Sequence, residues 1–443
     1  MFILILLILS VGLIVGLSTR LQVHPFLALI LAALFFGIAV GMPPETLITA
    51  INQGFGGTMG SIGLVIVLGV MIGALLEETG GAYKLAEAVL NIIGRNRVHE
   101  AMGFIGYLVS IPVFADSGFI ILNPLNKSLS KKAGLSMAGT AVALILGLLL
   151  THVMVPPTPG PIAAAGILGA DIGLVMLLGL GTSLLCLVVA IFYAKWVGKK
   201  VYLDPNPELT ESDIKAKMAT APSAFKTFLP IVIPILLIVM KSTLDFWYGE
   251  EKSLGLQWLS FIGTPVIALL IGLGVALFLP AKWDKHFVSH TGVMGRAIKD
   301  AANILLITGA GGIFGKVLQL SGIADELAPM VSGLEIGIWV PFLVAALIKT
   351  AQGSSTVALI TTASILAPLA DSLGFVAPIE KALLVVAIGA GSLVVSHAND
   401  SAFWVVTQMT GMKVGTGYRV YSLGTLIVGF FAACLLFLAS LFI

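Results

Sequence analysis

Long apolar runs alternate with short polar segments along this chain. Several runs come close to the ~20 residues that a helix needs to cross a bilayer, among them residues 2–19, 25–41, 62–76, 172–194 and 423–443. The longest polar segment, residues 201–226, is rich in Pro and charge and falls at the middle of the chain. The pattern predicts an all-α polytopic membrane protein whose two halves are joined by a polar cytoplasmic linker.

Composition agrees with this class. Hydrophobic residues make up 58% of the chain and charged residues only 10%, against about 25% charged in soluble domains. The first apolar run has no basic residue ahead of its core and no clear cleavage site, so we expect a retained span rather than a signal peptide. Both cysteines, Cys186 and Cys434, lie inside apolar runs, which argues against a disulfide framework, and we expect neither a metal site nor a cofactor.

Lysine and arginine gather in particular loops, although the net charge is only +2. Under the positive-inside rule these loops face the cytoplasm, which puts both chain termini outside. The charges are dispersed over short loops instead of forming one face, so we expect a lipid bilayer and not a nucleic acid as the partner. The basic residues assigned to the cytoplasmic side are Arg20, Lys84, Arg95, Arg97, Lys127, Lys131, Lys132, those within 195–226, Lys282, Lys285, Arg296, Lys299, Lys413 and Arg419.

The two halves look duplicated. Residues 73–89 (GALLEETGGAYKLAEAV) match residues 315–331 (GKVLQLSGIADELAPMV) at seven positions without a gap. The first copy continues into basic residues, whereas the second carries acidic ones. Equivalent segments should therefore lie on opposite sides of the membrane, which predicts two inverted-topology repeats over residues 1–200 and 227–443.

Each repeat should contain a re-entrant hairpin and a broken transmembrane helix. Only 29 residues separate Arg97 from Lys127, although both are assigned to the cytoplasmic side, and two spans of ~20 residues do not fit there. We expect hairpins over about 98–127 and about 339–369, followed by helices with a polar break over about 141–168 and about 383–406. Non-helical backbone at that depth must be buried in protein or line a wet cavity, so the four breaks are expected to meet near the midplane.

The most polar break reads SHANDS, residues 396–401. An Asp in the middle of a spanning helix costs ~2.5–3.5 kcal/mol on insertion scales, so it needs a compensating role. Ser, Asn and Asp can cap the half-helices that a break creates, or they can form a pocket for a solute or an ion. The candidates in this break are His397, Asn399, Asp400 and Ser401. The first hairpin offers the same two roles to Asp116, Ser117 and Gly118.

The second hairpin carries Lys349, a basic residue deep in a predicted membrane segment. It can snorkel or neutralise Asp116 or Asp400, or it can be the counter-charge of an anionic substrate. The residues that follow it closely are Gln352, Gly353, Ser354, Ser355 and Thr356. Their amide and hydroxyl groups suit a polyol, and the glycine lets the backbone come close to a ligand. In the first broken helix, PPTPGP cannot be continuous helix, and its Thr158 and Gly160 either line the site or belong to a packing kink.

Four residues are candidates for coupling transport to protons. A buried carboxyl group can exchange a proton when its surroundings change, and histidine titrates near neutral pH. These residues are Asp116, His152, His397 and Asp400. Hydroxyl, amide and carbonyl oxygens at helix breaks can hold sodium instead, so the residues alone leave proton and sodium coupling open.

Four segments together carry a family resemblance, namely residues 112–116 (PVFAD), 309–322 (GAGGIFGKVLQLSG), 352–358 (QGSSTVA) and 394–404 (VVSHANDSAFW). Over nearly its full length the chain resembles the gluconate permease (GntP) family, the gluconate:proton symporters of the ion transporter superfamily. The resemblance implies a homodimeric secondary transporter of the bacterial inner membrane. It also implies import of gluconate, or of a related sugar acid or short hydroxy acid, by proton symport with alternating access.

Three departures from the family pattern bear on the substrate. Asp116 stands where gluconate members generally have Glu, Lys349 where they often have Arg, and PPTPGP replaces a shorter Pro-Gly-Pro pattern. Lysine offers a point charge where arginine binds a carboxylate bidentately. Glycerate, a tetronate or D-serine are therefore alternative substrates, and a Na⁺-coupled carboxylate carrier is the alternative mechanism.

An enzyme and an ATP-driven pump are both disfavoured. No nucleophile, base and orienting residue can be assigned together from Asp116, Asp400, Ser396 and His397. GAGGIFGKV ends in Gly-Lys-Val, without the Ser or Thr that a phosphate-binding loop places on magnesium.

Overall fold

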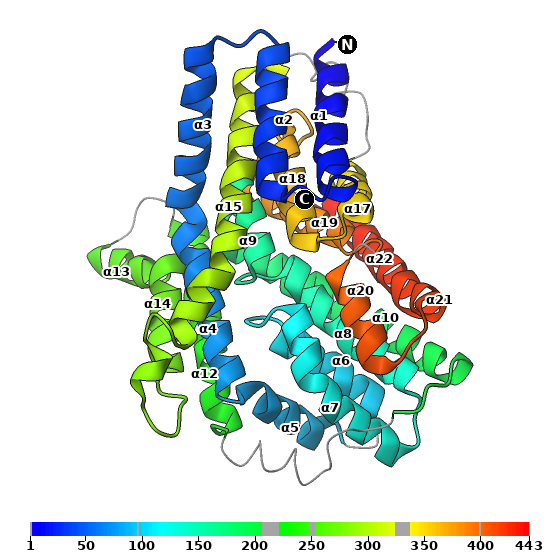
Figure 1. Cartoon of the computed structure of the whole chain (residues 1–443). Coiled ribbons are helices and arrows are strands. Elements are labelled where there is room, and N and C mark those ends of the chain that lie inside the picture. The colour runs from blue at the N-terminus through cyan, green and yellow to red at the C-terminus, as the bar shows by residue number, and fades with distance from the viewer. Residues whose placement is uncertain are drawn as a thin grey trace.

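A computed structural model describes residues 2–94, 97–205, 221–248, 253–323, 337–397 and 400–442, which form helices and turns with no strand among them. The first half contains α1 (Phe2–Thr19), α2 (Pro25–Ala39), α3 (Pro44–Thr58), α4 (Leu64–Glu78), α5 (Gly81–Ile93), α6 (Val98–Val109), α7 (Ala115–Ala133), α8 (Met137–Met154), α9 (Pro159–Leu168) and α10 (Ile172–Lys200). The second half contains α12 (Ala224–Tyr248), α13 (Leu254–Ile262), α14 (Pro265–Ala276), α15 (Val293–Leu320), α17 (Trp339–Gln352), α18 (Ser355–Leu366), α19 (Pro378–Ser392), α20 (Ser401–Thr410), α21 (Val414–Gly417) and α22 (Leu423–Ser440) (Figure 1). Short 3₁₀ and π segments lie at Met59–Gly63, Lys285–Phe287, Ala367–Leu369 and Tyr418–Ser422.

Several helices are long and apolar enough to cross a membrane. By length and composition there are five in the described chain, or up to seven if two bent pairs each form one span. One of the five runs from α8 through α9, so this predicted broken helix is a single candidate span. The all-helical class with several membrane spans, expected from the hydrophobic pattern, is confirmed.

Two long elements run side by side in opposite directions. Helix α3 continues through a π segment into α4, and α15 packs along both of them. A Cβ added at Gly54 of α3 would lie 2.5 Å from the Gly312 carbonyl oxygen of α15. At the other end, the Arg296 guanidinium near the start of α15 is 2.6 Å from the Glu78 carboxylate that ends α4. Figure 1 shows α15 rising beside α3 and α4 over most of the height of the molecule.

Four helices are interrupted inside the predicted membrane segments. The breaks follow α6, α8, α17 and α19, and α6 packs on α7 as α17 packs on α18. Thr151 and His152 lie near the end of α8, and Lys349 belongs to the last turn of α17. Helix α17 ends only at Gly353, whose φ of +85° is the left-handed conformation that a glycine C-cap adopts. Helix α9 starts at Pro159, since proline is well suited to a first helical position.

Helix α8 is the most enclosed element. All of its residues are buried except His152, which is half-buried. Its backbone lies directly against α6, because a Cβ at Gly147 would be 2.2 Å from the Gly103 carbonyl oxygen. In the same contact, a Cβ at Gly106 would be 2.4 Å from the Leu144 carbonyl oxygen. The helix that precedes the first break is therefore held in place by close backbone contact.

We expect Gly147→Val to lower the melting temperature of the purified protein in detergent. The new side chain has no room against α6, and overpacking a core typically costs about 1–3 kcal/mol. Gly181→Val is the matched control, since Gly181 is also in an apolar helix and has no heavy atom within 4 Å of an added Cβ. Equal melting temperatures for the two variants would contradict the close packing of α6 and α8.

Candidate functional site

The first turns of three helices line one cavity. The starts of α7, α18 and α20 contribute residues 115–117, 354–357 and 400–402 to a space of about 760 Å³. Unpaired backbone N–H groups and the positive end of the helix dipole face outward from a helix start, which favours an anion there. The start of α9 lies nearby, because Pro159 and His152 line a small adjoining space and His152 also lines the main cavity.

Two of the helices that follow a break, α18 and α20, are capped by the short polar side chain that precedes them. Asp400 caps α20, since its Oδ1 accepts a hydrogen bond of 3.1 Å from the Ala402 backbone N–H. Ser354 caps α18 in the same way, with 3.3 Å between its Oγ and the Val357 nitrogen. Capping residues satisfy N–H groups that would otherwise lack partners. The other N–H groups of a helix's first turn have no partner within the helix, and a ligand can satisfy them.

A second cavity of about 890 Å³ lies elsewhere, beside α7 and the C-terminal end of α20. The end of α20 presents carbonyl oxygens there, the charged lining residues are Lys127 and Asp204, and none of the described lining residues begins a helix, so no helix start offers N–H groups to an anion. The cavity at the helix starts is therefore the candidate site for an anionic ligand.

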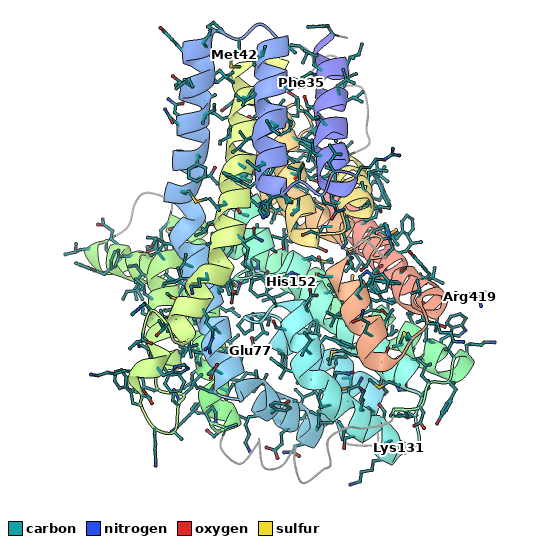
Figure 2. All side chains as sticks on the ribbon, viewed as in Figure 1. Phe35, Met42, Glu77, Lys131, His152 and Arg419 are labelled. Atoms are coloured by element: carbon teal, nitrogen blue, oxygen red, sulfur yellow. The ribbon has the colours of Figure 1, made fainter. Side chains whose placement is uncertain are left out.

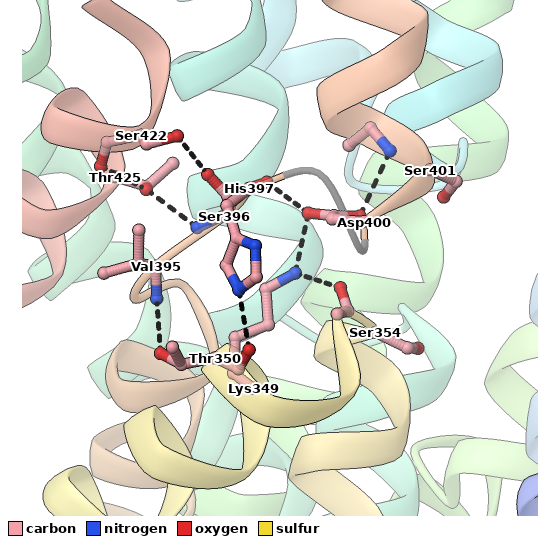
Figure 3. A network of polar contacts seen from close by, with 12 residues as sticks. Lys349, Thr350, Ser354, Val395, Ser396, His397, Asp400, Ser401, Ser422 and Thr425 are labelled. Atoms are coloured by element: carbon pink, nitrogen blue, oxygen red, sulfur yellow. Dashed lines mark hydrogen bonds and ion pairs between the residues drawn. The ribbon is translucent and has the colours of Figure 1, made fainter. Parts of the chain in front are cut away.

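A buried ion pair stands behind the cavity. The Nζ of Lys349 in α17 is 2.7 Å from Oδ2 of Asp400, and the two side chains are 1% and 8% exposed. Lys349 also donates to the Gly353 carbonyl oxygen. Figure 3 shows the two charged groups facing each other between the end of α17 and the start of α20. Of the roles open to Lys349, neutralising Asp400 is the one that this arrangement fulfils.

Ser396 connects this ion pair to the end of the chain. Its hydroxyl donates to Asp400 and lies 3.0 Å from the Tyr421 hydroxyl. Its backbone N–H donates to Thr425 Oγ1 at 3.2 Å, and its carbonyl accepts from Ser422 (Figure 3). The break after α19 is thus fastened to α22 and to the π segment before it.

Asp116 joins two of the helix starts. Its Oδ2 accepts a hydrogen bond of 2.7 Å from Ser401 Oγ, so the first turn of α7 is linked to the first turn of α20. Neither the salt bridges nor the hydrogen bonds among the described residues give Asp116 a cationic partner. Its carboxyl group therefore differs from that of Asp400, although both line the cavity.

The two candidate histidines occupy different environments. Buried Nδ1 of His152 has no hydrogen-bond partner among the described residues, and its ring packs edge-on against Phe114 at 5.9 Å between centroids. Figure 2 shows His152 near the middle of the molecule. His397 Nε2 lies 2.7 Å from the Thr350 carbonyl oxygen, which fixes the ring against α17 and outside the cavity lining.

The predicted site residues divide into two groups. Those that line the cavity are Asp116, Ser117, His152, Ser354, Ser355, Thr356, Asp400 and Ser401. Those that lie outside its lining are Gly118, Thr158, Gly160, Lys349, Gln352, Gly353 and His397. Asn399 lies outside the described residues. The transport roles of all these residues remain predictions.

Close packing explains why two of the predicted residues do not reach the cavity. A Cβ at Gly118 would be 2.6 Å from a Leu148 methyl group, and one at Gly160 would be 2.7 Å from a Leu359 methyl group. These glycines let helices approach each other. The Thr158 hydroxyl donates to the Val155 carbonyl oxygen at 2.5 Å, so it is used within the break between α8 and α9.

Sequence reasoning missed the opposite wall of the cavity. This wall consists of Lys299, Asp300, Asn303, Ile304 and Ile307 of α15, with His24 from the turn before α2. Lys299 was assigned to a cytoplasmic loop, but α15 already begins at Val293, so Lys299 lies within a helix. The usable signal was a run of polar residues at helical spacing just before an apolar stretch. No group of three or more metal-ligating side chains was found among the described residues.

Comparison with known proteins identifies the class. The D-serine transporter DsdX of Escherichia coli K12 is 33% identical over 446 residues, which cover 99% of this chain and 98% of that protein. A gluconate permease of Pseudomonas aeruginosa is 36% identical over 418 residues, covering 93% of this chain and 91% of that protein. This protein is a multi-pass membrane permease and not an enzyme. The model of the GntP family of permeases matches residues 1–442, and the chain belongs to that family.

A solved structure shares the fold at low sequence identity. It is that of MtrF from Neisseria gonorrhoeae, whose description places it in a class of antimetabolite efflux pumps. The TM-score is 0.61 at 16% identity, with 88% of this chain and 83% of that chain covered. At this identity the likeness concerns the fold alone.

We expect Lys349→Met to destabilise the protein strongly, because it leaves the buried Asp400 carboxylate without its cation. Removing one partner of a buried pair typically costs about 3–5 kcal/mol. The double variant Lys349→Met/Asp400→Asn should regain most of this stability, since both charges are gone and the amide can still cap α20. Thermal unfolding in detergent measures both effects.

The exposed pair of Lys131 and Asp204, 3.1 Å apart, supplies the control. Lys131→Met should change the melting temperature little, because exposed ion pairs contribute at most about 1 kcal/mol. If the double variant at the buried pair melts no higher than Lys349→Met alone, the charge-pair explanation is wrong.

Proposed function

We propose that this permease imports a small hydroxy-acid anion, gluconate or a related sugar acid, by proton symport with alternating access. The observation that carries the proposal is the cavity onto which three helix starts open, because their N–H groups and dipoles favour an anion. Its volume of about 760 Å³ falls within the range of about 300–1,000 Å³ typical of small-molecule sites.

The cavity lining suits a ligand with several hydroxyl groups. Ser117, Ser354, Ser355, Thr356 and Ser401 line it, and hydroxyl side chains can both donate and accept. The gluconate permease of Pseudomonas aeruginosa supports a sugar acid as the substrate. The similarity to DsdX supports D-serine as an alternative, and the departures at Asp116 and Lys349 support a shorter hydroxy acid such as glycerate.

Alternating access is supported by the arrangement of the two halves. Helices α4 and α15 contain the first six residues of the matching sequence segments, 73–78 and 315–320, and they run in opposite directions. Each is followed in its half by a helix pair joined at a break and then by an interrupted helix. This order supports inverted repeats over residues 1–200 and 227–443, with residues 201–226 as a cytoplasmic linker. We further propose a homodimer in the inner membrane, with both termini outside as the basic loops predict.

Proton coupling is proposed to involve Asp116 first. Asp400 is paired with Lys349, whereas Asp116 has a serine hydroxyl as its partner. A bound carboxylate and a charged Asp116 would repel each other, so binding of the anion favours binding of a proton as well. His152, His397 and Asp400 remain secondary candidates, and no cofactor is required. Sodium coupling is the alternative, because oxygen-rich helix breaks can also hold Na⁺.

Uptake into proteoliposomes tests the proposed function. We expect an inward proton gradient to drive accumulation of labelled gluconate, or of glycerate or L-threonate, in sodium-free buffer. A protonophore should abolish this accumulation. Uptake that requires sodium and resists the protonophore would support the Na⁺-coupled carrier instead, and uptake of D-serine alone would reject a hydroxy-acid substrate.

Asp116→Asn should separate binding from coupling. The amide can still accept the hydrogen bond from Ser401 but cannot carry the proton, so we expect exchange of labelled for unlabelled substrate to persist. Accumulation against a gradient should be lost. A variant that accumulates substrate like the unaltered protein would exclude Asp116 as the coupling residue.

A further inference from the structure

Lys349, the buried lysine behind the cavity, already has an ion-pair partner. Lys349 is 1% exposed, is paired with Asp400 at 2.7 Å and does not line the cavity. To receive a substrate carboxylate it would have to leave Asp400 charged and unpaired in a buried position, which is strongly unfavourable. An anion in the cavity therefore needs another cation.

Helix α15, on the opposite wall of the cavity, supplies such a cation in Lys299. Among the described residues that line the cavity, Lys299 is the only Lys or Arg. It forms no ion pair with another described residue, and its exposed side chain lines both this cavity and a smaller space that Glu77 and Glu78 also border. By contrast Arg296, one turn earlier, is bound to Glu78. Lys299 is thus the cation that a ligand can reach without breaking an existing contact.

The neighbours of Lys299 form a continuous strip along α15. Asp300, Asn303, Ile304 and Ile307 line the same cavity and recur at spacings of three and four residues, which puts them on one face of the helix. The strip is polar toward the start of α15 and apolar further along. A ligand lying along it would meet the ammonium group of Lys299 and the carboxylate of Asp300 first, then an amide, then methyl groups.

The helix starts do not make this cation redundant. Asp116 and Asp400 lie in or next to those first turns and line the cavity. Their carboxylates offset part of the positive potential of the helix ends. A carboxylate held between the two walls would gain the N–H groups of the helix starts on one side and an ammonium group on the other.

We propose that Lys299 receives the substrate carboxylate and that Asn303 hydrogen-bonds the hydroxyl groups next to it, while Lys349 stays in its structural pair with Asp400. This inference rests on the proposed function, that the cavity holds a hydroxy-acid anion. It makes α15 a specificity-determining wall of the site.

Competition between an acid and its uncharged isostere tests the proposal. Uptake of labelled gluconate into proteoliposomes is inhibited with unlabelled gluconate and, separately, with gluconamide. The unaltered protein should prefer gluconate clearly, because only the acid can pair with Lys299. In Lys299→Gln we expect KM for gluconate to rise about tenfold, the loss typical of one charge-assisted contact, and the preference over gluconamide to collapse toward one.

Three further variants separate a binding role from a structural one. Lys299→Arg should restore much of the preference, and Lys316→Gln, which removes a charge from α15 outside this cavity, should leave it unchanged. Lys349→Met/Asp400→Asn removes the deep cation without changing the net charge; its uptake rate is expected to fall because Asp400 lines the cavity, but its preference for gluconate over gluconamide should persist. The melting temperature of Lys299→Gln should stay near that of the unaltered protein.

The outcomes distinguish the inference from the proposed function. If Lys299→Gln keeps the preference for gluconate while the double variant at Lys349 and Asp400 loses it, the inference is overturned and the deep lysine is the substrate's partner. Transport of gluconate would then still support the proposed function. If the unaltered protein neither transports nor is inhibited by any hydroxy acid, the proposed function fails and the inference with it.

Discussion

The buried ion pair of Lys349 and Asp400 determines what the other polar groups of the site can do. It places two opposite charges, 2.7 Å apart, where neither could remain alone without a large desolvation penalty. Because it joins the end of α17 to the start of α20, it holds α20 against the pair of helices α17 and α18. It also removes Lys349 from the set of groups that a ligand can recruit. The groups that can contact a ligand in the cavity are therefore Asp116, the helix starts and the lining residues of α15.

A second constraint explains why the cavity is polar at all. A helix that is interrupted within a membrane exposes backbone N–H groups that lipid cannot satisfy. Ser354 and Asp400 satisfy some of these groups as caps, and the remainder of each first turn faces the same space. The breaks are compatible with the membrane because they are enclosed by helices such as α8, whose close contact with α6 depends on Gly103 and Gly147. The enclosure that the breaks require also creates the site.

Much of this arrangement could be predicted from the sequence, because polar residues inside apolar runs are rare and need a reason. The segments with breaks, the cavity-lining hydroxyls after Lys349 and the carboxyl groups of Asp116 and Asp400 all came from that signal. The choice between the possible partners of Lys349 could not be predicted, since it depends on how the end of α17 meets a break some fifty residues later in the chain. Lys299 was misplaced for a related reason. A lysine near a cluster of basic residues looks like part of a loop, and only the start of α15 at Val293 puts it inside a helix.

Charge balance links the two walls of the cavity to the proposed coupling. The lining contains three carboxyl groups, Asp116, Asp300 and Asp400, and one ammonium group, that of Lys299, while Lys349 is paired with Asp400 behind it. With every group charged the site already carries an excess negative charge, and an anionic substrate would add another. A proton on Asp116 offsets the added charge, and of the two carboxyl groups at the helix starts this one can accept it without breaking an ion pair. Under the proposed coupling, an anion would be more stable in the site when a proton is present, and this thermodynamic linkage is what a symporter of an anion and a proton requires.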